Sequence, residues 1–184
     1  MEVTEDIKLK TPSLITDRLV LRLFTADDVR EVFDCWQSDA DVARYMMWES
    51  SNDIEKAREF IDFELFMIEN DKWYRWCIAD KESGTIYGTC LVYFNDEENC
   101  CDISYSLGKK YWGNGYITEA MKKAMDYTTN TLGIKEYIAS HAIQNPASGK
   151  VIEKLGFQYE KDIPYICNGG KIHTMGKFYR LVIE

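Results

Sequence analysis

The sequence predicts a mixed α/β fold in which about four helices pack on a mostly antiparallel sheet of about seven strands. Three observations lead to this prediction. The hydrophobic pattern alternates repeatedly between the short period of strands and the longer period of helices. Short polar turns, rather than linkers or low-complexity segments, separate the periodic stretches. The 184 residues, 46% of them hydrophobic, match the size of one domain, so we expect residues 1–184 to form a single domain.

The first expected element is a strand over residues 14–24. Leu19 and Leu21 fall on one side of it, and charged residues alternate on the other. Two helices are expected next. Thr25, with acidic residues directly after it, is a typical cap for the first helix, and Asp53 is a candidate cap for the second.

Three strands on short connections follow. Residues 72–79 are rich in aromatic residues, and turn-forming residues separate the stretches 72–79, 85–94 and 100–107. Such an arrangement predicts an antiparallel meander. A glycine-bearing loop at residues 108–115 then leads into a helix with a regular apolar face, for which Gly133 is a typical C-terminal cap.

The last third of the chain predicts a strand, a short helix and a hairpin. Residues 134–143 form the strand, and Asn145 opens a helix that Gly156 ends. Residues 157–167 and 171–183 flank an Asn-Gly-Gly turn and are expected to pair as a hairpin.

The charge balance narrows the classes of partner. The formal net charge is −9, which argues against a general nucleic-acid surface. An acidic protein can attract cationic partners such as amines or basic peptides, although the excess of acid can equally serve solubility alone. Both explanations stay open at this point.

The spacing of the cysteines and the length of the apolar runs indicate the cellular compartment and whether a metal site is expected. The six cysteines include no C-x-x-C pair and only two histidines accompany them, so we expect no metal site and reduced thiols. Residues 1–6 are acidic, and no apolar run approaches the roughly 20 residues of a membrane span. We therefore expect a cytoplasmic protein without membrane contact, either a monomer or a homodimer.

The loop at residues 108–115 is the strongest candidate binding site. Gly113 and Gly115 directly precede a helix, whose first N–H groups and positive dipole end suit a phosphate or pyrophosphate. The P-loop pattern is absent, and the third glycine of a dinucleotide-binding fingerprint would fall at Thr118. Taken alone, the glycines are also compatible with an ordinary structural turn.

Three ordered motifs resemble the GNAT acetyltransferase superfamily. Residues 110–115, K-Y-W-G-N-G, resemble its [R/Q]-x-x-G-x-[G/A] signature, with Lys110 as the departure. The continuation through T-E-A at residues 118–120 is similar to the ribosomal-protein-alanine, or Rim-type, branch. Residues 16–22 resemble that branch's T-x-R-L-x-L-R strand, and residues 145–157 its N-x-A-S…E-K-L-G-F segment.

The resemblance implies the GNAT fold, with coenzyme A bound where the parallel strands 100–107 and 134–143 splay apart. The implied ligands of the pyrophosphate are backbone N–H groups of Lys110, Gly113, Asn114, Gly115 and Tyr116. The implied contacts of the pantetheine arm are the strand edge at Tyr105, Ser106 and Leu107 and the side chain of Asn145, which is also a typical helix cap before proline.

The implied activity is acetyl transfer from acetyl-CoA to a primary amine, most specifically a protein N-terminal α-amino group. Acetylation of a small cationic amine, such as a polyamine or an aminoglycoside, is the alternative. A second alternative is a non-catalytic coenzyme A-binding regulatory module, because Ile152 stands where many family members have a catalytic tyrosine.

We expect Ser148 to donate the proton or hold a water in place of that tyrosine. Asp102, Glu49 and Glu97 are candidate bases. A weak base suffices for an α-amino group, whose pKa of about 7.7–8.0 leaves a sizeable neutral fraction. His141 is expected to be structural or to line the cleft. The expected acceptor-pocket aromatics are Tyr45, Trp48 and Trp73, whereas Trp76 is more typical of core.

Overall fold

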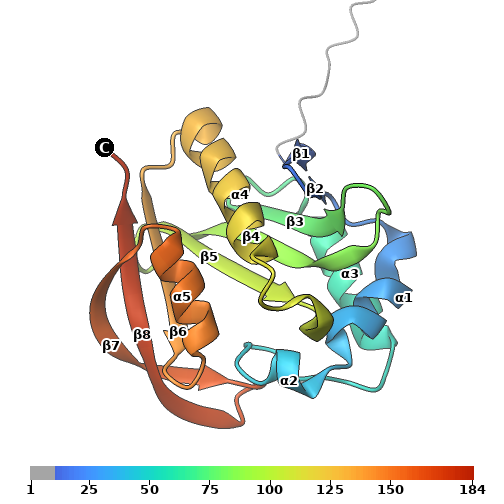
Figure 1. The fold of residues 1–184 in the computed structure, drawn as a ribbon. Coiled ribbons are helices and arrows are strands. Elements are labelled where there is room, and N and C mark those ends of the chain that lie inside the picture. The colour runs from blue at the N-terminus through green and yellow to red at the C-terminus, as the bar shows by residue number, and fades with distance from the viewer. Residues whose placement is uncertain (1–10) are drawn as a thin grey trace, which may run out of the picture.

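The structure, a computed structural model, describes residues 11–184 and confirms the predicted fold class. The acidic start at residues 1–6 lies outside the described residues. Eight strands form one sheet in the order β1-β2-β3-β4-β5-β6-β8-β7 (Figure 1). The strands are β1 (Leu14–Ile15), β2 (Leu19–Arg22), β3 (Trp73–Asp80), β4 (Ile86–Asn95), β5 (Cys100–Leu107), β6 (Glu136–Ala142), β7 (Gln158–Cys167) and β8 (Ile172–Val182). Within this sheet β5 and β6 pair in parallel, and the other neighbours pair antiparallel.

Helices cover both faces of the sheet (Figure 1). They are α1 (Val29–Val32), α2 (Ala40–Ala43), α3 (Glu55–Met67), α4 (Tyr116–Leu132) and α5 (Pro146–Lys154). α4 and α5 lie on one face, whereas α1 and α3 lie on the other. The predicted meander and the C-terminal hairpin are confirmed, each with ends within two residues of the expected ones.

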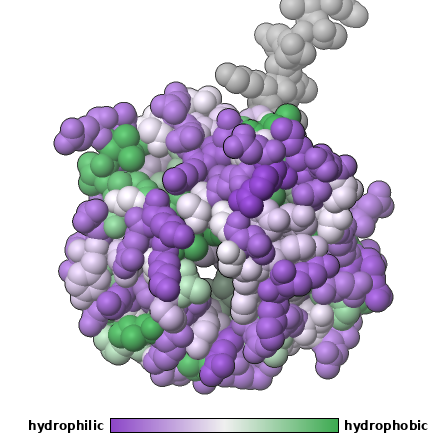
Figure 2. Space-filling view, viewed as in Figure 1, coloured by the Kyte–Doolittle hydropathy of each residue, from purple (hydrophilic) through white to green (hydrophobic). Residues whose placement is uncertain are grey.

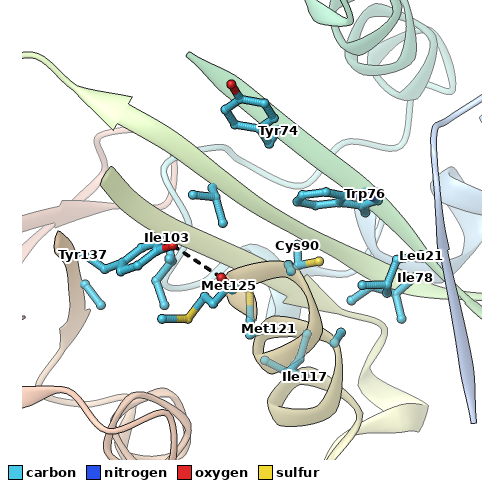
Figure 3. Packing of buried hydrophobic residues seen from close by; sticks show 14 of the residues in the cluster. Leu21, Tyr74, Trp76, Ile78, Cys90, Ile103, Ile117, Met121, Met125 and Tyr137 are labelled. Atoms are coloured by element: carbon cyan, nitrogen blue, oxygen red, sulfur yellow. Dashed lines mark hydrogen bonds between the residues drawn. The ribbon is translucent and has the colours of Figure 1, made fainter. Parts of the chain in front are cut away.

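The main core lies between α4 and the sheet. The apolar stripe of α4 places Ile117 and Met121 on side chains from the central strands, including Trp76 and Cys90 (Figure 3). Tyr137 of β6 is fully buried beside this stripe, and its hydroxyl donates to the backbone carbonyl of Met125 at 3.4 Å. Burial of this stripe against the sheet fixes the direction of α4, and with it the place where its N-terminus begins.

The expected strand over residues 14–24 is wrong in one respect, because the structure divides it. β1 and β2 form a tight hairpin, closed by a hydrogen bond from the Thr16 backbone N–H to the Leu19 carbonyl at 3.0 Å. The polar residues of the turn bind α4: Thr16 donates its hydroxyl to the Glu119 carboxylate at 2.6 Å. A continuous strand would leave this contact unmade.

The region of the two predicted helices is also more broken than expected. Thr25 is the N-cap of a 3-10 turn that runs into α1, and Asp28 accepts a hydrogen bond from the Thr25 backbone at 2.7 Å, so the first predicted helix start is confirmed. The cap residue of α3 is Ile54 rather than the expected Asp53, although the Asp53 side chain accepts from the Glu55 backbone at 3.0 Å. After α1, however, the chain passes through a π turn at Phe33–Gln37 and then forms the separate helix α2. Asp39 caps α2 by accepting from the Asp41 backbone at 2.8 Å.

Removal of the Met121 side chain tests the packing of α4. Met121 is fully buried, so we expect Met121→Ala to lower the free energy of unfolding by about 2–5 kcal/mol, through lost burial and the cavity left behind. The exposed neighbour Lys122 provides the control, since Lys122→Ala is expected to stay within about 0.5 kcal/mol of wild type. Urea unfolding monitored by circular dichroism measures both, and equal midpoints would contradict this packing.

Candidate active site

The parallel pair at the centre of the sheet separates soon after it forms. β5 and β6 are in register only at Cys101 with Tyr137 and at Asp102 with Ile138. Beyond that point β6 continues to pair with β8, and β5 with β4. The edge of β5 at residues 103–107 that faces β6 is therefore without a strand partner in the described part of the chain. Figure 2 shows this face of the molecule hollowed near its centre, between α5 and the end of β5.

The glycine loop lies directly beyond this free edge. Gly113 and Gly115 both have positive φ, at 78° and 79°, a conformation that side chains disfavour. Asn114 stabilises the loop from within by donating its side-chain amide to the carbonyls of Tyr111 and Trp112 at 3.1 and 3.0 Å. Gly115 then starts α4, whose first N–H groups have no partner within the helix. The loop has the shape and the free donors that an anion requires.

The β1–β2 turn holds this loop through α4. The Glu119 carboxylate accepts from the Thr16 hydroxyl, from the Arg18 backbone N–H at 3.0 Å and from Arg18 Nε at 2.7 Å. Arg18 also donates to the Asn114 carbonyl at 3.1 Å, and its guanidinium lies 4.5 Å from the centre of the Tyr116 ring. Two of the motifs singled out in the sequence thus meet in space.

The predicted residues Lys110, Ser106 and Leu107 occupy the same end of β5. The Lys110 ammonium lies 4.8 Å from the centre of the Tyr111 ring. The Leu107 carbonyl accepts from the Trp112 indole at 2.7 Å, which fixes the exit of the strand. Ser106 is buried.

Tyr105 and Ser148 meet across the opening. The Tyr105 side chain leaves β5 toward α5, and its hydroxyl lies 2.8 Å from Ser148 Oγ and 3.2 Å from the Ser148 carbonyl oxygen. Burial raises the pKa of Tyr105 well above its usual range. Asn145 caps α5, its side-chain oxygen accepting from the Ser148 backbone at 3.4 Å. The capping role anticipated for Asn145 is confirmed, and its contact with pantetheine stays a prediction.

Asp102 lies on the opposite face of β5, where the splay begins. The Tyr93 hydroxyl, across the β4–β5 ladder, donates to its carboxylate at 3.0 Å. Burial raises the pKa of Asp102 to about 6, against the opposing effect of this hydrogen bond. Asp102 and Ser148 therefore flank the free edge of β5 from its two sides.

The other two candidate bases lie elsewhere. Glu49 is exposed in the segment after α2 and forms an ion pair with Lys171. Glu97 is exposed in the β4–β5 turn, at the end of β5 away from the glycine loop. His141, expected to be structural or to line the cleft, is buried, with ring nitrogens close to the Ala142 carbonyl oxygen and the Tyr179 hydroxyl, at 2.8 and 3.2 Å.

A cavity of about 370 Å³ lies between the sheet and α3, and reaches the end of β5. Trp48 and Trp73 line it together with further aromatic and methionine side chains, and their role in an acceptor pocket stays a prediction. Trp76 is fully buried in the core on the other side of the sheet, which agrees with its expected core role. Tyr45 does not line the cavity, and its carbonyl instead accepts from the Tyr165 hydroxyl at 3.3 Å.

The sequence alone did not identify three polar residues near the opening as candidate site residues. Tyr93 contacts Asp102, and Arg75 and Glu64 form a buried ion pair 2.7 Å apart in the wall of the cavity. The register of the meander was the signal that could have found Tyr93, because it places that residue directly across from Asp102. No spacing in the sequence relates Glu64 on α3 to Arg75 on β3.

Comparison with known proteins identifies the family. The family described as "Acetyltransferase (GNAT) domain" matches residues 18–158. The chain belongs to this family. An N-acetyltransferase of Bacillus licheniformis named p20, whose function is uncharacterized, is 32% identical over 149 residues, which cover 80% of this chain and 83% of the relative. The predicted family and enzyme class, an acetyl-CoA-dependent N-acetyltransferase, are confirmed.

Two further similarities are more distant. The [ribosomal protein uS5]-alanine N-acetyltransferase of Escherichia coli is 31% identical over 80 residues, 42% of this chain and 41% of that protein. The crystal structure of a microcin C7 self-immunity acetyltransferase in complex with acetyl-CoA and AMP has the same fold, with a TM-score of 0.82, 23% identity and coverage of 95% and 99% of the two chains.

Residues 11–184 contain neither a membrane-spanning helix nor a cluster of metal-binding side chains. No helix in this range is long and apolar enough to cross a membrane. The same range contains no group of three or more His, Cys, Asp and Glu side chains placed to hold one metal ion, and its six cysteines are free.

The raised pKa of Asp102 predicts a pH-dependent stability. The folded state binds the proton more tightly than the unfolded state, whose aspartate pKa is about 3.9. The resulting stabilisation is complete below pH 4 and is lost as the pH rises through about 6. Relative to Asp102→Asn, wild type should therefore lose on the order of 2–3 kcal/mol of unfolding free energy between pH 4 and pH 7.

Urea titrations at several pH values measure this difference. Asp126→Asn, at an exposed site on α4, is the control and should follow wild type throughout. Parallel curves for wild type and Asp102→Asn would show that the carboxyl is not perturbed.

Proposed function

We propose that this enzyme acetylates the α-amino group at a protein N-terminus. The observation that carries the proposal is the free edge of β5 between a glycine loop at one end and the Asp102 carboxylate at the other. The local similarity to a ribosomal-protein-alanine acetyltransferase supports the same acceptor class.

The residues present fit acetyl-CoA. The edge of β5 that faces away from β4 at residues 103–107 would offer N–H and C=O groups to the pantetheine amides, as an edge strand does to an added strand, although the Leu107 carbonyl already accepts from the Trp112 indole. The N–H groups around Gly113 and Gly115 and at the start of α4 would receive the pyrophosphate. Lys110 would add a positive charge there, in place of the arginine or glutamine of the family signature.

The chemistry proposed is direct attack of the neutral amine on the thioester carbonyl. The new C–N bond forms and the C–S bond breaks. The proton lost by nitrogen passes to the Asp102 carboxylate, directly or through water, and the leaving thiolate takes a proton from the Ser148 and Tyr105 hydroxyl pair. With a pKa of about 6, Asp102 is ionised at neutral pH and still basic enough to accept a proton.

The side chains near the opening argue against the alternative of a non-catalytic, coenzyme A-binding regulatory module. Ile152, where many relatives carry a tyrosine, is fully buried and offers no polar group. The hydroxyls of Tyr105 and Ser148, 2.8 Å apart at the opening, supply a proton donor from two other elements. We therefore favour the catalytic function over a regulatory coenzyme A-binding module.

The acceptor class is tested on one peptide that carries both a free N-terminal alanine and an internal lysine. We expect acetylation at the α-amino group, because its pKa lies roughly two to three units below that of lysine. Each unit raises the fraction of amine in the neutral form by about tenfold. Fragmentation mass spectrometry after incubation with acetyl-CoA locates the product. Preferential modification of lysine, or activity on polyamines alone, would exclude the proposed acceptor.

Ser148→Ala tests the proton donor. We expect kcat to fall by about 10²-fold or less, the low end for acid–base groups, because Tyr105 remains. The affinity for coenzyme A, measured by calorimetry, should change little. Ser83→Ala, in the exposed β3–β4 turn, is the control. A turnover number equal to that of wild type would remove Ser148 from the mechanism.

A further inference from the structure

The cavity beside β5 contains one ion pair in a wall rich in aromatic side chains. Trp36, Trp48, Trp73, Phe60 and Phe63 contribute rings to it. Among the described residues that line the cavity, Arg75 is the only cation and Glu64 the only carboxylate. Both are largely buried, with side-chain exposures of 14% and 4%. Burying a charged side chain costs free energy of folding, so packing alone does not explain an arginine at this position.

The strand register relates Arg75 to the free edge of β5. Arg75 lies opposite Leu91, and Leu91 lies opposite Ser104, so the three form one row across β3, β4 and β5. Adjacent strands are about 4.8 Å apart, which puts Arg75 and Ser104 about 10 Å apart along this row. The arginine side chain shortens this gap, since its Nη1 reaches to 3.4 Å from the Thr89 hydroxyl of β4. The row therefore places Arg75 on the cavity face of the sheet, two strands away from the free edge of β5.

The hydrogen-bonding capacity of Arg75 is largely unused. Its Nε lies 2.7 Å from Glu64 Oε1 in the buried ion pair, which engages one of its five N–H donors. The contact to Thr89 is long. Glu64 directs its other oxygen to the Trp73 indole at 2.8 Å, and the Trp73 and Phe60 rings flank the guanidinium at 5.3 and 5.5 Å. These contacts hold the planar guanidinium of Arg75 in place, and its remaining N–H donors stay available for a ligand.

The charge balance of the cavity selects among acceptors. Glu64 is already paired with Arg75, so the cavity offers no free carboxylate, among the described residues that line it, to the additional ammonium groups of a polyamine. The guanidinium would also repel such groups. An oxygen acceptor, in contrast, matches the unused N–H donors.

We propose that Arg75 is a specificity-determining residue that binds the carbonyl oxygen adjacent to the reacting amine, so that the acceptor class is an α-amino carbonyl compound. Glu64 is the positioning residue that orients the guanidinium. The aromatic wall receives the side chain of the acceptor's first residue. This inference rests on the proposed function and narrows it, because it names the group that distinguishes a peptide N-terminus from a simple amine.

The test compares a short peptide with a free N-terminal alanine and the same peptide with its first carbonyl oxygen replaced by sulfur. A thioamide sulfur is a weaker acceptor, whereas the reacting amine is retained. Wild type should prefer the oxygen peptide by about tenfold in kcat/KM, the value of one hydrogen bond to a charged group. Arg75→Met combined with Glu64→Gln removes the ion pair and keeps an acceptor for the Trp73 indole.

In this double variant we expect kcat/KM for the oxygen peptide to fall by roughly 10- to 100-fold, mainly through the acceptor KM. The preference for oxygen over sulfur should fall to about one, and the affinity for coenzyme A should stay within twofold. The matched control is Arg58→Met with Glu55→Gln, an exposed Arg–Glu pair in the first turn of α3, at the end of the helix away from Glu64, which should behave as wild type.

Failure of the inference and failure of the proposed function give different results. If wild type acetylates no peptide α-amino group, the proposed function is wrong. If wild type acetylates the peptide and the double variant retains both the acceptor KM and the oxygen preference, Arg75 does not recognise the carbonyl. If the double variant does not fold, Arg75→Lys replaces it in the test, since lysine keeps the charge beside Glu64 but lacks the planar guanidinium. An unchanged oxygen preference in Arg75→Lys would equally overturn the inference.

Discussion

The early separation of β5 from β6 is the constraint on which the rest of the site depends. Each strand is committed to another partner, β5 to β4 and β6 to β8, and the two touch in register only around Asp102 and Ile138. A sheet edge inside a protein is normally paired, because unpaired backbone groups are costly to bury. Here the opening leaves those groups available beside the glycine loop. The proposed binding mode uses them as an edge strand is used by an added strand.

The anion-binding end of this opening is held by contacts between distant parts of the chain. Glu119 in the first turn of α4 is bound by Thr16 and Arg18, and Arg18 also contacts the loop at Asn114. A carboxylate near a helix N-terminus would otherwise compete with a bound pyrophosphate for the positive end of the dipole. Its pairing with Arg18 compensates that charge and also ties the loop to the β1–β2 turn.

The two faces of β5 have different chemistry because side chains alternate along a strand. Tyr105 points toward α5 and meets Ser148, whereas Asp102 lies on the side of Tyr93 and of the aromatic cavity. The proposed base and the proposed proton donor thus approach the reacting bond from opposite sides. The Arg75–Glu64 pair lies on the cavity side, where an acceptor would enter.

The sequence by itself determined the order and type of nearly all elements, the loop at residues 108–115, the capping roles of Thr25 and Asn145, and the family. These features depend on local periodicity, glycine conformation and short-range hydrogen bonds, all of which involve residues near one another in the chain. The division of residues 14–24, the Tyr105–Ser148 contact and the Arg75–Glu64 pair were decided by the tertiary structure alone. Each joins residues that only the strand register or the packing of α3, α4 and α5 brings together. A one-residue change in register would turn the strand side chains Arg75 and Tyr105 to the other face of the sheet.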